Sequence, residues 1–306
     1  MFRAWVTARL KQLVGGLAEP LRGLAMPLVF RPGKGLRAAL VQACAPEASA
    51  DPELVARLGA VVELIHLASL LHDDVVDRSA TRRGAPAAHT VAGPEQATLA
   101  GLACFALAGM EAASIGGGAD LLTARACSGL SYGQVLDVER AFDTSLTIED
   151  YTELAARKTG ELFQLSCLLG AASGDTDPET GRLLGSFGLS FGIAFQILDD
   201  CLDLDAGQAG KPTGLDHLRG LFGAPTLYAL AADASGGLAE LLLSPDLAAD
   251  DIPVVRRMVV DLGGLHAARQ LAADHQQRAV NVLGAADTRV RDRVLTVVSD
   301  LSFSGR

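Results

Sequence analysis

The sequence contains few of the residues that typify β structure. Phe, Trp and Tyr make up only 5% of its 306 residues. No segment alternates apolar and polar side chains beside a hairpin dipeptide such as Asn-Gly. A sandwich or barrel of strands is therefore not indicated, and helices are expected to build the core.

Cysteine pairs and an excess of positive charge are also absent. The five cysteines are scattered, odd in number and include no CxxC pair. This pattern argues against a disulfide framework or a zinc site and fits reduced thiols in the cytoplasm. The net charge of −10 provides no general basic face for a nucleic-acid backbone. We therefore expect a cytoplasmic protein with no nucleic-acid partner.

Long uncharged runs are missing as well. The longest, such as residues 183–198, fall short of about 18 residues and are rich in Gly and Ser. We therefore expect no transmembrane segment. The basic amphipathic start, MFRAWVTARLKQLV, has two interpretations. It is either a transit peptide or membrane-surface helix, or a first helix that packs Phe2, Val6 and Leu10 on the core, and we favour the second.

Segments with the period of an α-helix follow one another along almost the whole chain. Their starts carry helix signals: Asp51-Pro52 begins one segment, and Thr147 with Asp150 has the spacing of a capping box. No low-complexity linker divides the chain, so we predict one all-α domain spanning residues 1–306. The expected helices cover residues 2–18, 35–45, 52–76, 95–114, 119–140, 147–171, 178–204, 223–233, 251–262, 264–283 and 287–301.

Two apolar helices end in the same acidic pattern, DDxxD. Positions i and i+4 of a helix lie about 40° apart, with i+1 on the adjoining flank, so each motif aims three carboxylates at one patch. Carboxylates this close raise one another's pKa unless cations neutralise them, and Mg²⁺ prefers oxygen ligands together with water and phosphate. A solvated helix end explains one copy, but chance gives DDxxD only about 0.1 times in this chain, and a calcium loop needs another spacing. We therefore predict a metal site made by Asp73, Asp74, Asp77, Asp199, Asp200 and Asp203.

Basic residues near the two motifs indicate an anionic ligand. Taken singly, each is typical of a solvated surface charge. Together with carboxylates and Mg²⁺, they describe a diphosphate site. They lie in four segments, which are PGKGLR at the start of a helix (Lys34, Arg37), TRRGAP (Arg82, Arg83), ARKTGELF (Lys158, followed by Thr159) and AGKPTG (Lys211).

These motifs, in this order, resemble those of the trans-isoprenyl diphosphate synthases, also called polyprenyl synthetases. The resemblance rests on ELIHLASLLHDDVVDRSATRRG, KTGELF, FQILDDCLDL and GKPTGLD. It implies an all-α, single-domain isoprenoid synthase bundle around a deep central cavity, with the Asp motifs on opposite walls. It also implies a homodimeric prenyltransferase with three Mg²⁺ per active site. Such an enzyme joins an allylic diphosphate head to tail (1′-4) with isopentenyl diphosphate and yields an all-trans prenyl diphosphate.

The resemblance also implies a role for each motif residue. Asp73, Asp74, Asp77, Asp199 and Asp203 would bind the metals that hold the allylic diphosphate, with Asp200 in support. Arg82, Lys158 and Lys211 would contact that diphosphate. Lys34, Arg37, His66 and Arg83 would hold isopentenyl diphosphate, and Thr159 and Gln196 would steady the allylic cation.

The helix that ends at the first motif carries two further expectations. A lone His on an apolar helix is typically a core residue, but His66 lies two turns before Asp73 on nearly the same face, so we favour a ligand role. Ala68 and Ser69, one turn before Asp73, are small where short-chain members have aromatic residues. The channel for the growing chain should therefore stay open, and we predict a product longer than farnesyl (C15). Its floor would be set by Phe105, Met110 or Tyr132.

Four positions depart from the family pattern: Gly35, Leu102, Leu221 and Gly223. Leu102 lies in residues 99–110, which are apolar nearly all round and are typical of a helix in the middle of a bundle. Both Asp motifs are intact, which favours an active enzyme. A class I terpene cyclase and a non-catalytic subunit of a heteromeric synthase remain alternatives. A long product would also permit peripheral membrane contact.

Overall fold

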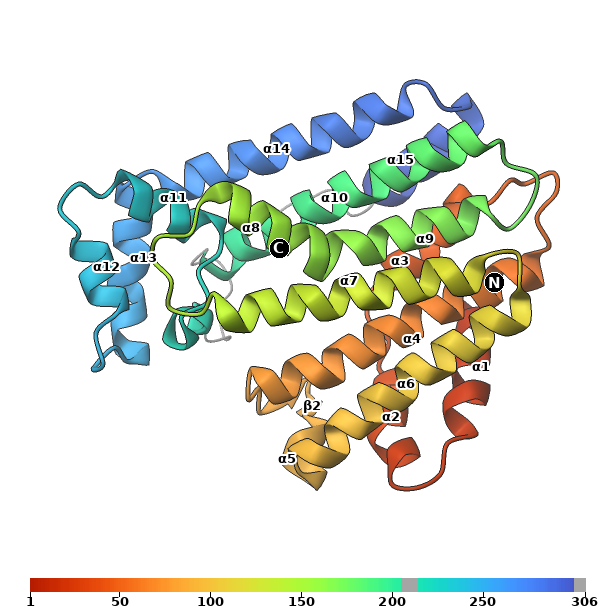
Figure 1. Ribbon diagram of the computed structural model, residues 1–306, viewed down its shortest axis with the longest axis horizontal. Coiled ribbons are helices and arrows are strands. Elements are labelled where there is room, and N and C mark those ends of the chain that lie inside the picture. Colours follow the sequence, from red (N-terminus) through yellow and green to blue (C-terminus); the bar gives the residue numbers. More distant parts are fainter. Residues whose placement is uncertain (205–213, 300–306) are drawn as a thin grey trace. The chain divides into compact units, whose positions relative to one another are not determined.

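The computed structural model describes residues 1–204 and 214–299, and its regular structure is almost entirely helical (Figure 1). By the pattern of contacts between Cα atoms, the chain divides into two compact units, each assembled from separate segments. The prediction of an all-α protein is confirmed, whereas that of a single domain stays a prediction. In the described part, the first unit comprises residues 1–128, 162–185 and 283–299, and the second 129–161, 186–204 and 214–282.

The α-helices follow the predicted segments closely, but a π-helix divides the segment predicted over 147–171, and three short α-helices were not predicted. The predicted helices appear as α1 (Phe2–Gly15), α3 (Leu36–Cys44), α4 (Pro52–Val76), α6 (Pro94–Ile115), α7 (Ala119–Glu139), α8 (Ile148–Ala155), α9 (Glu161–Ala171), α10 (Pro178–Leu204), α11 (Ala224–Ala232), α13 (Ile252–Asp261), α14 (Gly264–Leu283) and α15 (Thr288–Ser299). The additional elements are α2 (Leu21–Phe30), α5 (Ala88–Ala92), α12 (Gly237–Leu242), the π-helix η1 (Ala156–Gly160), the 3-10 helices η2 (Leu215–Arg219) and η3 (Ala249–Asp251), and a hairpin of β1 (Thr81–Arg82) and β2 (Ala85–Pro86).

Helix α4 organises the first unit. It begins where the sequence predicted, because the Asp51 side chain accepts the backbone N–H of Glu53 at 3.0 Å and Pro52 occupies the first turn. Helix α1 packs closely on it at Gly59, where an added Cβ would lie 2.9 Å from Cγ2 of Val6. Val6 is buried as predicted, and this close contact fixes the position of α1 on the unit.

Helix α6 differs from the expectation of a helix in the middle of a bundle. One face is buried through Ala100, Cys104 and Ala108. The opposite face exposes Leu102 by 59% and Met110 by 69%. The segment is therefore a surface helix with an apolar outer face.

Three helices, α4, α6 and α10, are long and apolar enough to cross a membrane by length and composition alone. We expected no transmembrane segment because every uncharged run in the sequence is short. These three helices reach the required length because each is apolar on average although it contains a few charged residues. The most apolar 18-residue stretch of each helix is buried inside the protein by 67% in α4 and 56% in α10, but by only 33% in α6.

The core of the second unit is formed by side chains from five helices. Tyr151, Ile197, Leu227, Val255 and Ala268, from α8, α10, α11, α13 and α14 respectively, are all buried in it. Helix α8 starts with the predicted capping box, in which the Thr147 and Asp150 side chains each accept the other's backbone N–H at 3.1 Å.

Candidate active site

The first Asp motif, at the end of α4, divides into two kinds of carboxylate. Asp74 is buried, and its Oδ1 accepts a hydrogen bond from Nε of Arg82 at 2.7 Å and forms an ion pair with Nη2 at 2.5 Å. Asp73 and Asp77 are only partly buried and lie four residues apart on one helix face. The middle carboxylate therefore binds an arginine inside the unit, and the outer two lie nearer the surface.

The hairpin after α4 positions two of the predicted arginines. Its turn residues Arg83 and Gly84 both have positive φ, +51° and +73°, as a type I′ hairpin turn requires. Arg82 stands just before the turn and binds the Asp motif. Nη1 of Arg83 donates a hydrogen bond to the carbonyl oxygen of Arg31 at 2.9 Å, and Nη2 lies 3.5 Å from Nε2 of His66. The sequence did not predict this hairpin, because two-residue strands are too short to show alternation.

Arg37, His66 and Arg83 lie close together in the first unit. The guanidinium carbon of Arg37 lies 4.7 Å from the ring centre of Phe163, and burial lowers the pKa of Arg37 to about 10. Burial and the nearby guanidinium groups also hold the pKa of His66 well below its usual value. The carboxylate among them is Glu63, whose pKa is raised by burial although the arginines act the other way. The cluster therefore carries more positive than negative charge.

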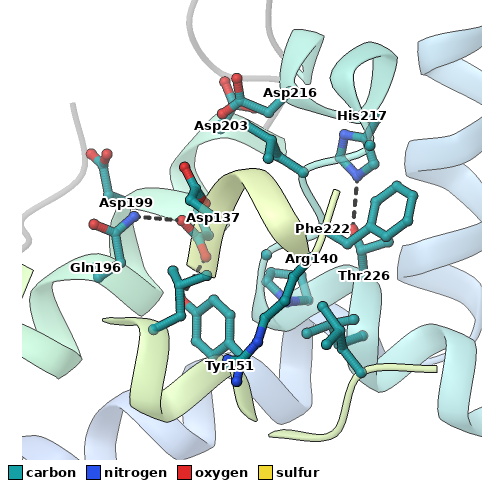
Figure 2. A pocket seen from close by; sticks show the side chains of 18 of the residues that line it. Asp137, Arg140, Tyr151, Gln196, Asp199, Asp203, Asp216, His217, Phe222 and Thr226 are labelled. Carbon is teal, nitrogen blue, oxygen red and sulfur yellow. Dashed lines mark hydrogen bonds between the residues drawn. The ribbon is translucent and has the colours of Figure 1, made fainter. Parts of the chain in front are cut away.

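The second unit contains a cavity of about 200 Å³ around the second Asp motif (Figure 2). Lys158 and Thr159 reach this region from η1, where the helix widens into a π-turn, a distortion common at functional sites. Lys158 forms an ion pair with Asp137. The lining combines charged groups (Asp137, Arg140, Lys158, Asp199, Asp200, Asp203, Asp216) with apolar walls (Leu146, Leu154, Leu221, Phe222, Pro225, Leu227).

A chain of hydrogen bonds fixes Asp200 inside this cavity. Its Oδ1 accepts from Nε2 of Gln196 at 2.9 Å, and its Oδ2 accepts from the Tyr151 hydroxyl at 2.5 Å and from the Ala224 N–H at 3.4 Å. Thr159 in turn donates its hydroxyl to Oε1 of Gln196 at 2.6 Å. Burial raises the pKa of Asp200 to about 7. Asp200 thus orients Gln196 and Thr159, which agrees with a supporting role.

Asp199 and Asp203 are the outer carboxylates of the second motif, and Asp216 lies near Asp203. Partial burial raises the pKa of Asp203, and both burial and Asp203 raise that of Asp216. Between residues 1–204 and 214–299, no three His, Cys, Asp or Glu side chains are close enough to hold a metal ion alone. Mg²⁺ typically takes one or two carboxylates and completes its shell with water and phosphate, so these oxygen donors fit it once a diphosphate is bound. Lys211 lies outside the described residues.

Several residues of both clusters were not predicted. Glu63 lies one helix turn before His66, a spacing that could have suggested it. Asp216 closes the GKPTGLD motif and could also have been recognised. Asp137 and Tyr151 are brought to the cavity by tertiary packing, for which the sequence gives no local signal.

The four departures from the family pattern have structural contexts. A Cβ on Gly223 would lie 2.5 Å from Oδ2 of Asp200, so glycine permits this carboxylate to approach α11. Leu221 adds an apolar side chain to the cavity wall. Gly35 has φ +67°, a conformation that favours glycine. Leu102 lies on the exposed face of α6.

The residues expected to set chain length are placed differently from one another. Ala68 is completely buried, and Ser69 donates its hydroxyl to a backbone carbonyl one turn earlier. Phe105 is half-buried against a histidine ring of α4. Met110 and Tyr132 are largely exposed. Their effect on product length stays a prediction.

The chain is similar to known proteins over nearly its whole length. A sequence model of the family described as polyprenyl synthetase matches residues 19–255. A geranylgeranyl diphosphate synthase from Mycobacterium tuberculosis is 36% identical over 279 residues, which cover 88% of this chain and 79% of the relative. A nonaprenyl diphosphate synthase from the same organism is 34% identical over 262 residues, covering 83% and 77%.

A solved structure gives the same result for the fold. The polyprenyl synthase from Caulobacter crescentus, complexed with calcium and isoprenyl diphosphate, superimposes with a TM-score of 0.89. It is 32% identical, and the match covers 98% of this chain and 95% of the other.

Proposed function

The chain belongs to the polyprenyl synthetase family and is a prenyltransferase, and we propose that it elongates an allylic diphosphate with isopentenyl diphosphate. The observation that carries the proposal is the cluster of Arg37, His66 and Arg83. Nε of Arg37 is buried and has no hydrogen-bond partner in the described structure, so the cluster is suited to an anion. A cyclase uses one diphosphate substrate and needs no such acceptor site. The structural relatives also favour synthesis of a chain over cyclisation.

The second unit supplies groups suited to ionising the allylic diphosphate. Lys158, held by Asp137, places a positive charge where the diphosphate would bind. The Thr159 hydroxyl donates a hydrogen bond to Gln196. Its oxygen lone pairs therefore remain available to stabilise a positive carbon. Apolar walls exclude water, which would otherwise quench the cation.

We further propose that the metal ion is Mg²⁺, with three ions per active site as the family resemblance implies. Bound divalent cations would neutralise the charge that develops on the departing pyrophosphate. Asp73, Asp77, Asp199 and Asp203 are the proposed ligands. The relative that holds calcium supports a divalent cation. That both motifs serve one allylic diphosphate stays a prediction.

The exposed face of α6 supports the proposal of a homodimer. Leu99, Leu102, Ala106, Met110 and Ala113 are exposed, and their spacing of three, four, four and three residues forms one stripe along the helix. An isologous pair of such stripes would bury them. Replacing Leu102 by Asp should convert a dimer to a monomer in light scattering. A wild-type monomer that binds phospholipid vesicles would instead assign the stripe to a membrane surface.

We place the enzyme in the cytoplasm, where its soluble diphosphate substrates are available. A fluorescent fusion that remains soluble on cell fractionation would support this location. Recovery with the membranes would favour peripheral attachment through the product or α6.

One incubation tests the proposed reaction. Purified protein is mixed with Mg²⁺, farnesyl diphosphate and labelled isopentenyl diphosphate, and the products are separated by chain length. Labelled products longer than C15 are expected. Cyclic hydrocarbons without label would indicate a cyclase, and no turnover would indicate a non-catalytic subunit.

A further inference from the structure

Arg3, in the first turn of α1, reaches the loop that precedes α3. Its Nη2 donates a hydrogen bond to the carbonyl oxygen of Gly33 at 2.5 Å. Its Nε lies 3.6 Å from the position that a Cβ on Gly35 would occupy. The guanidinium therefore lies beside Gly35, whose left-handed conformation favours glycine.

The position of Arg3 is set by packing that involves three helices. A Cβ on Gly59 of α4 would lie 2.9 Å from Val6, 3.3 Å from Phe2 and 3.5 Å from Ala38 of α3. Helices α1, α3 and α4 therefore meet at this glycine. The first turn of α1 is consequently held beside the start of α3, although the Arg3 side chain itself is exposed.

The surrounding charges favour an anion at this loop. A Cβ on Gly33 would lie 3.0 Å from Nη2 of Arg83, so that arginine lies close to the residue that Arg3 contacts. Lys34 and Arg37 add two more positive charges. The charge of Glu63 acts on Arg3, Arg37 and Arg83, and that of Asp73 acts on Arg37. Four cations against these two carboxylates leave a positive excess that a diphosphate would neutralise.

We infer that Arg3 is a fourth cationic residue that binds the diphosphate of isopentenyl diphosphate, so that α1 contributes a positive charge to this site. This inference rests on the proposed function of the Arg37, His66 and Arg83 cluster. It adds to that cluster a residue from a different helix, which lies outside every motif of the sequence. Arg3 contacts the solvent edge of the loop, so its effect should be on binding rather than on the chemical step.

Steady-state kinetics of Arg3→Ala and Arg3→Lys test the inference. Arg3→Ala should raise the KM for isopentenyl diphosphate about fivefold, the effect of one partly exposed charged contact. It should leave kcat and the KM for the allylic diphosphate unchanged. Arg3→Lys should restore most of the affinity because it keeps the charge. Lys11→Ala, which removes a positive charge from the same helix, should behave as wild type.

A second measurement keeps the test independent of turnover. Inorganic pyrophosphate binding is measured by calorimetry for wild type, Arg3→Ala and Lys11→Ala. Weaker binding by Arg3→Ala alone supports the inference, even if wild type elongates nothing. The absence of elongation would count against the proposed function only. Equal binding by all three, or equal changes in both KM values together with a lower melting temperature, would show that Arg3 merely anchors the loop.

Discussion

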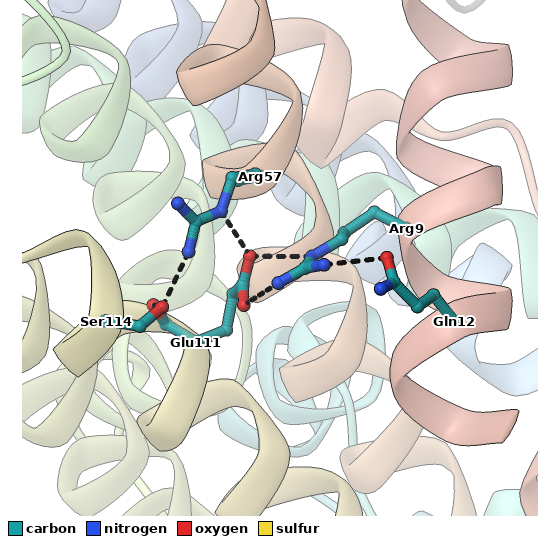
Figure 3. A network of polar contacts seen from close by, with 5 residues as sticks. All are labelled: Arg9, Gln12, Arg57, Glu111 and Ser114. Carbon is teal, nitrogen blue, oxygen red and sulfur yellow. Dashed lines mark hydrogen bonds and ion pairs between the residues drawn. The ribbon is translucent and has the colours of Figure 1, made fainter. Parts of the chain in front are cut away.

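Glu111 offers the sharpest test of how the first unit is held together. Its side chain, on α6, is only 2% exposed and lies between two arginines (Figure 3). Arg9 of α1 donates to both oxygens, with Nε to Oε1 at 2.9 Å and Nη2 to Oε2 at 2.6 Å. Arg57 of α4 donates to Oε1 at 2.7 Å. One carboxylate therefore joins three helices.

Replacing Glu111 by Gln keeps the shape but removes the negative charge. Hydrogen bonds to charged groups contribute about 1.5–3 kcal/mol each, against about 0.5–1.5 kcal/mol for neutral ones, so three weakened bonds set an upper limit of roughly 4 kcal/mol. Both arginines are about a quarter exposed, 26% and 27%, and water compensates part of the loss. We expect the free energy of unfolding to fall by about 2 kcal/mol. Arg57→Ala should cost about 1 kcal/mol, because the paired bonds from Arg9 remain.

The assay is urea unfolding followed by circular dichroism at pH 7 and at pH 4. Burial opposes ionisation of Glu111, but the hydrogen bonds from Arg9 and Arg57 prevail and lower its pKa from 4.5. Its stabilising effect is therefore present above pH 4.5 and is lost as the pH falls below it. The difference between wild type and Glu111→Gln should shrink at pH 4. A variant within about 0.5 kcal/mol of wild type at pH 7, the range of ordinary surface substitutions, would refute this reasoning.

Three further predictions concern function and pH. Ala68→Phe should shorten the product, and an unchanged product distribution on chromatography would contradict the open channel. Tyr151→Phe removes the 2.5 Å hydrogen bond to Asp200 and should lower kcat about tenfold with little change in KM, because it loosens a charge-assisted contact that orients the reacting groups. Burial and nearby guanidinium groups lower the pKa of His66, so stability should fall as the pH drops below about 6.5. His66→Gln should flatten this dependence in thermal melts, whereas the exposed His266→Gln should not, and equal slopes would argue against a neutral His66.

Most of the helical fold could be predicted from the sequence, because long amphipathic segments with clear start signals leave little ambiguity. Helices α4, α10 and α14 have the predicted bounds. Helix α2 was missed because Pro27 interrupts its pattern. Helices α5 and α12 contain only five and six residues, too few to show a period. The π-turn at Ala156–Gly160 depends on packing rather than on local composition.

The residue types of the candidate site could be predicted from the sequence, but the different contacts of its individual carboxylates could not. The shared DDxxD pattern gives no hint that Asp74 binds an arginine and that Asp200 binds a tyrosine. That distinction requires Arg82 from a hairpin and Tyr151 from another helix, neither of which sequence spacing reveals. The contact of Arg3 was even harder to predict, because Arg3 lies some thirty residues from the loop that it contacts.

The division of the chain into two units has a consequence for how the protein can fold and be dissected. The first unit needs three stretches of sequence and the second needs two in the described part, and the first is completed only by residues 283–299. No single cut therefore releases an intact half, and a ribosome must make nearly the whole chain before either part can close. Folding should be slow and cooperative, because contacts between distant segments carry a large entropic cost before they stabilise anything. Swapping halves between relatives at one crossover should fail, whereas exchanges within one segment should be tolerated.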